Sequence, residues 1–194
     1  AWRTSPDWGQ TWAPPRDFLS FDTDWLVYMP TALLADARTM RVAVSGHPRE
    51  ASAKPLHDVW ACLVDLVTGT VTAPSDGRVL GNLRTGENLP LNFTALELVD
   101  RTPADRTANL FDVSNGPVFE IGYVSKLKDD FSTRDGKHHV ASLRVGRWRL
   151  ETIAPTGRKF GYIDAGFYVG SIAFPDRAAS GQLYLTREEQ GLWH

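Results

Sequence analysis

Histidine, tyrosine and arginine side chains at the ends of apolar segments are the residues of this chain best suited to chemistry. His47 follows an apolar segment and precedes Pro48, which ends a strand and leaves the imidazole near a rim. Tyr123 ends another apolar segment, and Arg144 precedes a glycine turn. Histidine or tyrosine can transfer a proton, and the planar fork of arginine can bind a carboxylate bidentately. Together these residue types could transfer a proton next to a bound carboxylate.

Each candidate also has a structural interpretation. In that interpretation the imidazole of His47 forms a hydrogen bond with a loop backbone group. Tyr123 is an ordinary strand aromatic whose hydroxyl is exposed to water, and Arg144 is exposed to solvent. His138 and His139 are adjacent, so on a strand they face opposite sides, and at most one of them can enter a given site.

Two other kinds of function are compatible with the residues. A glycoside hydrolase needs two positioned carboxyl groups, or a tyrosine nucleophile with an acidic partner, but no available carboxylate lies in a distinctive motif. A glycan- or protein-binding domain needs only exposed aromatic side chains, which otherwise serve packing. The candidate carboxylates are Asp24, Asp112, Glu120 and Asp164, and the candidate aromatics are Trp25, Trp60 and Tyr168.

The stretch Ser5 to Trp12 indicates which kind of element would position these residues. It spells S-x-D-x-G-x-T-W, the pattern called an Asp-box. Its short Ser and Asp side chains can hydrogen-bond to turn backbone groups. Gly9 can take the positive φ of a tight turn, and Thr11 and Trp12 start the returning strand. We expect a β-hairpin turn here.

The rest of the chain has all-β patterning, because short apolar or alternating segments rich in Val, Ile, Leu, Tyr and Trp are separated by Gly, Pro, Asp and Asn. Residues 30–37 could hold at most a helical turn or two. The predicted strands are Trp25 to Tyr28, Met40 to Ser45, Val59 to Leu66, Ala95 to Val99, Val118 to Val124, His138 to Val145, Trp148 to Ile153, Phe167 to Phe174 and Gln182 to Thr186.

Related turns recur at spacings of roughly 45 to 80 residues, the range of β-propeller blades with long loops. The chain then divides into the end of one blade (1–16), a full blade (20–75), a connection (73–90), a second full blade (90–155) and the start of another (160–194). A β-sandwich with similar turns is the alternative.

The ordered series of motifs resembles the BNR repeat-like family of propellers that includes the ulvan lyases and related polysaccharide-degrading proteins. The Asp-box is its sharp element, and the other pieces are weak matches in the same order. These pieces are Tyr28 to Leu34, Ser45 to Pro48, Pro117 to Tyr123, Tyr168 to Ala173 and Leu183 to Arg187.

The resemblance implies an exported, extracellular or periplasmic polysaccharide lyase that cleaves a uronate-containing anionic polysaccharide by β-elimination. A sialidase- or rhamnosidase-type hydrolase and a non-catalytic glycan- or protein-binding propeller remain the alternatives. It also implies that His47, Tyr123 and Arg144 are catalytic, and that Tyr28, His139 and Tyr168 bind substrate. Tyr28 stands where some lyases of the family have a catalytic histidine, which is a departure from their mechanism.

Composition excludes several other classes. The 21 Lys and Arg nearly balance the 23 Asp and Glu, so we expect no nucleic-acid partner. No apolar run is long enough for a spanning helix, and Cys62 is the only cysteine, so neither a membrane segment, a disulfide nor a cysteine metal site is expected. No cofactor or metal motif is visible. Because the chain begins without Met just before a turn motif, we expect a fragment whose partners include the remaining blades of the same protein.

Overall fold

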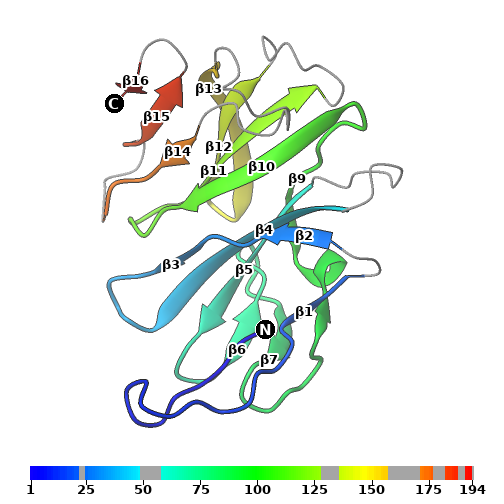
Figure 1. Cartoon of the computed structure of the whole chain (residues 1–194), viewed down its shortest axis with the longest axis vertical. Helices are drawn as coiled ribbons and strands as arrows, with labels where there is room; N and C mark the ends of the chain where they lie inside the picture. The colour runs from blue at the N-terminus through cyan, green and yellow to red at the C-terminus, as the bar shows by residue number, and fades with distance from the viewer. Residues whose placement is uncertain are drawn as a thin grey trace.

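The computed structural model describes residues 1–21, 25–48, 58–127, 136–156, 171–176, 182–187 and 191–193. These residues form β-strands, turns and one short 3₁₀ helix, η1 (Phe93–Ala95), so the all-β prediction is confirmed. The strands make three antiparallel sheets and one short parallel pair, β1 (Leu19–Ser20) with β8 (Leu91–Asn92). Figure 1 shows the first sheet in the lower half of the molecule, the second sheet above it and the third sheet at the upper left, beside the second.

The first sheet has seven strands and contains the first half of the chain. Its order is β2-β4-β5-β6-β7, with β3 beside β4 and β9 beside β5. Neighbouring strands pair antiparallel throughout. The strands are β2 (Trp25–Tyr28), β3 (Thr31–Leu33), β4 (Thr39–Pro48), β5 (Val59–Asp65), β6 (Thr70–Thr72), β7 (Val79–Asn82) and β9 (Glu97–Asp100).

The second sheet is a four-stranded antiparallel meander in chain order, and a three-stranded sheet follows it. The meander consists of β10 (Arg106–Val113), β11 (Phe119–Leu127), β12 (Lys137–Arg144) and β13 (Arg147–Pro155). The third sheet consists of β14 (Ile172–Ala173), β15 (Tyr184–Arg187) and β16 (Gly191–Trp193).

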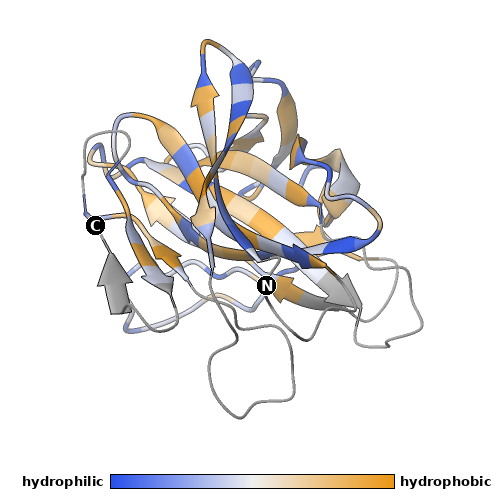
Figure 2. Ribbon diagram, turned by 90° about the horizontal axis from the view of Figure 1, so that it is seen from above, coloured by the Kyte–Doolittle hydropathy of each residue, from blue (hydrophilic) through white to orange (hydrophobic). Residues whose placement is uncertain are grey.

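Two hydrophobic cores lie on opposite faces of the first sheet, as the alternation of strand side chains requires. On β4, Val42 and Val44 face one core, in which Trp60 packs edge-to-face on Phe93 of η1. Ala43 faces the other core, between the first and second sheets. Apolar residues accordingly concentrate in the central strands (Figure 2).

Buried polar contacts fix the sheets against each other. Arg41 of β4 is 5% exposed, and its Nη1 donates to the carbonyl oxygens of Ser114, Gly116 and Val118 at 2.8 to 2.9 Å in the β10–β11 turn. On the far face of the second sheet, the Asp112 carboxylate accepts from the backbone N–H of Phe174 at 2.7 Å. The order of the stack is therefore held by specific bonds as well as by apolar packing.

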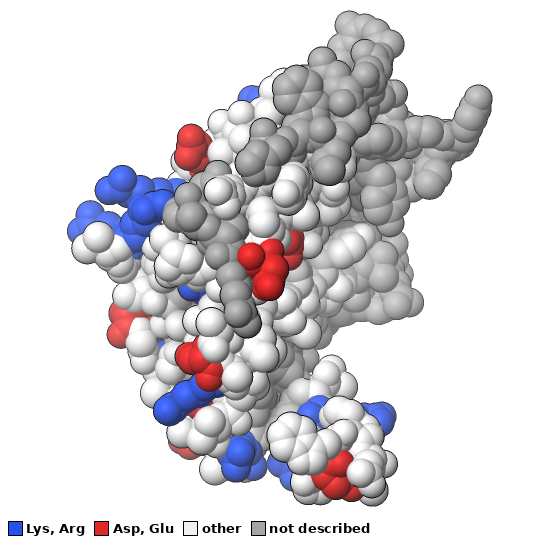
Figure 3. Space-filling view, turned by 90° about the vertical axis from the view of Figure 1, so that its left-hand side faces the viewer, with Lys and Arg blue, Asp and Glu red and all other residues white. Residues whose placement is uncertain are grey.

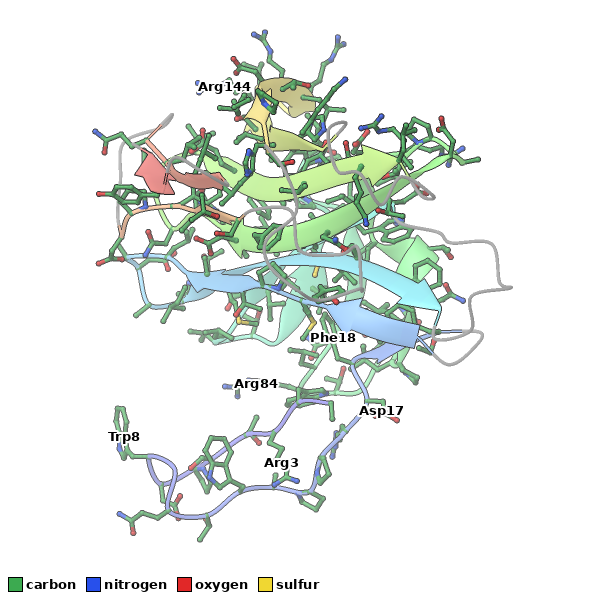
Figure 4. The ribbon with its side chains drawn as sticks, turned by 45° about the horizontal axis from the view of Figure 1, so that its top comes forward. Arg3, Trp8, Asp17, Phe18, Arg84 and Arg144 are labelled. Atoms are coloured by element: carbon green, nitrogen blue, oxygen red, sulfur yellow. The ribbon has the colours of Figure 1, made fainter. Side chains whose placement is uncertain are left out.

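The Ser5 to Trp12 turn has the hydrogen bonds that its residue types predict. The Ser5 hydroxyl accepts from the N–H of Gly9 at 2.6 Å, and the Asp7 carboxylate accepts from both the N–H and the hydroxyl of Thr11. Gly9 has φ +90°, and the Trp12 indole donates to its carbonyl. The turn lies at the end of an arm that extends from the sheets, with Trp8 at its tip (Figure 4).

Four segments differ from the sequence-based expectation. Thr11 and Trp12 start no strand, and an isolated bridge between Trp2 and Arg16 joins the two sides of the arm instead. Thr31–Leu33 is strand β3, where a helical turn had been allowed, and the expected connection at 73–90 contains β7. Strand β10 was missed because both of its faces are covered, so buried Thr107 and Asn109 interrupt its apolar pattern. The first sheet consequently extends to Asp100, beyond the boundary expected at residue 75.

Candidate functional site

Tyr123 and His139, both predicted site residues, lie side by side on the second sheet. They are directly opposite each other in the β11–β12 ladder. Their rings stack with centroids 5.0 Å apart and planes inclined by 19°. Both side chains point toward the first sheet, as His139 lies on the same face as Ala141, which belongs to the core between the sheets. The structure therefore settles which of the two adjacent histidines faces this site.

The Tyr123 hydroxyl connects the two sheets. It donates a hydrogen bond of 2.7 Å to the carboxylate of Asp100, the last residue of β9. Burial raises the pKa of Tyr123 far above its ordinary value, and the neighbouring charge of Asp100 and the hydrogen bond to it act in the same direction. The hydroxyl therefore keeps its proton at neutral pH.

His139 is held by hydroxyl groups on both of its ring nitrogens. Nε2 lies 2.7 Å from Oγ of Ser125, and Nδ1 lies 3.2 Å from Oγ1 of Thr152. Burial lowers the pKa of His139, and nearby Arg106 and Lys137 lower it further, while Asp100 opposes them. The imidazole is therefore neutral at pH 7, and one ring nitrogen is a potential proton acceptor.

A cleft of about 340 Å³ opens beside these side chains. Two cations, Arg106 at the start of β10 and Lys137 at the start of β12, line it together with Asp100 and Glu151. Arg106 also donates to the Ser125 hydroxyl at 3.3 Å. The cleft thus brings an imidazole, a protonated phenol, two cations and two carboxyl groups to one place.

The segment between β9 and β10 supplies one wall of the cleft, including Thr102 and Pro103. The carboxylate of Asp58 holds this segment by accepting from the N–H of Thr102 at 2.9 Å. Burial raises the pKa of Asp58, although the Thr102 bond and Arg101 oppose the effect. Asp58 immediately precedes β5, so the start of this central strand of the first sheet positions the wall.

Arg144 lies far from Tyr123 and His139. It is the last residue of β12, five positions beyond His139, or about 17 Å along an extended strand. It also lies on the opposite face of the sheet, since it alternates with Leu143 of the inter-sheet core. Figure 4 shows it at the end of the molecule opposite the arm. The expected grouping of Arg144 with Tyr123 is therefore absent from this structure.

The remaining predicted residues are placed in part. His47 pairs with Leu26 near the end of β4, at the sheet end where β5 begins and β9 reaches Asp100; its side chain lies outside the described residues. Tyr28 is half-buried against the inter-sheet core. Tyr168 lies outside the described residues.

Sequence reasoning missed the polar residues of the cleft other than Tyr123 and His139. Ser125 could have been found, because it lies two positions after Tyr123 and so shares its strand face. Asp100, Arg106 and Lys137 come from three other strand ends, and only the sheet stacking brings them together. Of the alternative candidates, Trp60 is buried in the core, and Asp112 is engaged by backbone N–H groups.

The sequence matches no protein-family model and no curated protein. In the described part of the chain we find no helix with the length and apolarity needed to cross a membrane. Nor do the described residues include a group of three or more His, Cys, Asp or Glu side chains that could hold a metal ion.

Proposed function

We propose that this chain is part of a β-propeller that cleaves an anionic, uronate-containing polysaccharide by β-elimination. The propeller proposal is supported by the stacking of successive antiparallel sheets, one of them a complete four-stranded meander in chain order. The lyase proposal rests on one observation, the imidazole of His139 stacked on Tyr123 in a cleft that Arg106 and Lys137 help to line.

Each group has a task in this reaction. Arg106 and Lys137 bind the uronate carboxylate and offset the charge that develops on it when the neighbouring C–H is broken. His139 takes that proton at Nδ1, where substrate replaces the longer of the two hydroxyl contacts, that with Thr152 at 3.2 Å. The electron pair forms a C=C bond, and the glycosidic C–O bond breaks. The imidazolium then returns the proton to the leaving oxygen.

Tyr123 has a different role from the one expected from sequence. Because its hydroxyl is bound to Asp100 and keeps its proton, it orients the imidazole by stacking and does not act as the base. His139 replaces it as the proton-transfer group. Arg106 and Lys137 replace Arg144 as the carboxylate anchor.

A second candidate is a propeller that binds anionic glycans without cleaving them. The engagement of the Tyr123 hydroxyl by Asp100 favours it, because that bond serves the structure whether or not a reaction occurs. The same cations would then bind the carboxylate, and His139 would be a hydrogen-bond partner of a sugar hydroxyl.

Incubation with uronate polysaccharides separates these functions. We expect ultraviolet absorbance from an unsaturated product to rise together with reducing ends, and His139→Gln to abolish both. The exposed Arg147→Gln variant on the same sheet is the matched control and should keep full activity. Reducing ends without absorbance would indicate hydrolysis, and retained binding without either product would indicate the glycan-binding function.

A further inference from the structure

A second cavity, of about 790 Å³, lies on the other face of the second sheet. Strands β11, β12 and β13 form one side of it, and residues 182, 183 and 185, in and just before β15, form the other. It is separated from the Tyr123 cleft by the sheet itself, because Tyr123 and Glu120 project from opposite faces of β11. The volume lies within the range of small-molecule sites.

Half of the residues that line this cavity are apolar, and two carboxyl groups, those of Glu120 and Glu151, lie among them. Val140, Ile153, Leu183 and Leu185 contribute apolar surface. Glu120 is 4% exposed and accepts a bond from the Ser142 hydroxyl at 3.4 Å. A carboxylate has about four lone-pair sites, so Glu120 can accept a further hydrogen bond.

Two arginines add positive charge to the lining. Arg149 is paired with Ser142 across the β12–β13 ladder, and Arg144 lies two positions after Ser142, so both share its face. Both residues are exposed. Figure 3, seen from the left-hand side of Figure 1, shows Lys and Arg side chains gathered at the left edge of the upper half of the molecule. A guanidinium fork matches the oxygens of a carboxylate or sulfonate.

We infer that this cavity binds a small organic anion with an apolar body. Its acidic group meets Arg144 and Arg149, its apolar part packs on Val140, Ile153 and Leu185, and a hydroxyl or amino group donates to Glu120. The apolar side chains therefore match the apolar body of the ligand, the two arginines match its negative charge, and the buried Glu120 carboxyl matches its hydrogen-bond donor. This inference does not rest on the proposed lyase function, because its arginines and Glu120 lie outside the Tyr123 cleft; the two cavities meet at β13, where Leu150 and Glu151 line both.

The probe 8-anilinonaphthalene-1-sulfonate tests the inference, since it combines aromatic rings, a sulfonate and an N–H donor. We expect saturable fluorescence enhancement with one site. Arg149→Gln and Arg144→Gln should each weaken binding by roughly tenfold, as the loss of a charge-assisted contact implies. Arg147→Gln is the matched control, because Arg147 belongs to the same hairpin but does not line the cavity, and its affinity should be unchanged.

A volume test complements the charge test. Ile153→Trp fills the cavity and should abolish saturable binding while cooperative unfolding in urea is retained. Binding that does not saturate, that survives Ile153→Trp, or that falls equally in Arg147→Gln and Arg149→Gln would overturn the inference. A protein that loses probe binding through the arginine variants but keeps polysaccharide elimination would support the inference and separate it from the lyase site.

Discussion

The hydroxyl of Tyr123 donates a 2.7 Å hydrogen bond to the carboxylate of Asp100, and this bond joins the first and second sheets beside the cleft. Tyr123 is 1% exposed, so its hydroxyl would lose its partner without gaining full access to water if Asp100 moved away. The bond therefore links the stability of the stack to the shape of the site.

Replacement of Tyr123 by Phe should lower the free energy of unfolding by about 2 kcal/mol, the usual range for a hydrogen bond to a charged group. Asp100→Asn should lower the free energy of unfolding by less, because the amide oxygen can still accept a hydrogen bond from the tyrosine hydroxyl. Urea denaturation of the two variants measures the difference. Equal losses would show that the charge of Asp100, and not the hydrogen bond, holds the sheets.

Arg41 of β4 makes a second polar connection between the first and second sheets, at the β10–β11 turn. Its guanidinium packs 5.0 Å from the ring centre of Phe119, and burial lowers its pKa to about 10, so it stays protonated at neutral pH. Arg41→Met retains apolar volume but leaves three backbone carbonyls without this donor, and should cost about 3 kcal/mol or more.

The measurement for Arg41→Met is again urea denaturation, and Arg38→Met, three residues earlier in the chain and just before β4, is the control for loss of a charge. Arg38 forms an exposed ion pair with Asp65, and such pairs contribute little, typically below about 1 kcal/mol. If Arg41→Met lowers the free energy of unfolding no more than Arg38→Met does, the bonds from Arg41 to the β10–β11 turn do not hold the two sheets together.

Local sequence patterns predicted much of the secondary structure. A strand with one apolar face shows an alternation of apolar and polar residues, and glycine marks the turns between strands. Trp25–Tyr28 and the start of β5 at Val59 agree with the expected bounds. Strand β10 and the position of β9 in the first sheet could not be predicted in this way. They depend on long-range pairing, in which a strand covered on both faces carries buried polar residues.

The candidate site was predictable only within single strands. Tyr123 and His139 were identified from residue type and strand position, but their pairing depends on the β11–β12 register. Arg144 was placed with them because it follows on the next strand, although an extended chain carries it to the far end of the sheet. The cations that do line the cleft, Arg106 and Lys137, begin strands and lie in no motif.

Gly122 marks the contact between the second and third sheets. A Cβ built at Gly122 would lie close to the side chain of Ile172 on β14, with the nearest carbon at 2.5 Å. Gly122→Ala should therefore destabilise the protein by about 1 to 3 kcal/mol through overpacking. In an Ile172→Ala background the same change should cost much less, and this double-mutant cycle is measured by urea denaturation. Additive effects would show that β14 does not pack on Gly122.

Asp65 connects the turns at the ends of β4 and β5 through Arg38. The bond from Arg38 Nη2 to the Asp65 carboxylate is 2.6 Å, and it contributes most to lowering the pKa of Asp65 to about 2. A lowered carboxyl pKa stabilises the fold above the ordinary value of 3.8, and this contribution is lost as the pH falls toward 2. The stability difference between the protein and Asp65→Asn should shrink over that interval in acid titrations of thermal unfolding. A difference that is constant from pH 5 to about 2 would contradict the assignment.

His139 should also make the stability of the fold depend on pH. As for Asp65, stability falls as the pH drops, but here the cause is a buried base that resists protonation. Its pKa is lowered from 6.5 by burial, so below pH 6.5 the unfolded chain binds a proton that the folded protein does not. Stability is therefore expected to fall as the pH drops below 6.5, and to be independent of this group above it. His139→Gln keeps hydrogen-bonding groups for Ser125 and Thr152 but cannot titrate, so its unfolding midpoint should vary less between pH 7 and 5. An unchanged slope in that variant would mean that the imidazole is as easily protonated in the folded protein as in the unfolded chain, which would remove the basis for its role as a neutral proton acceptor.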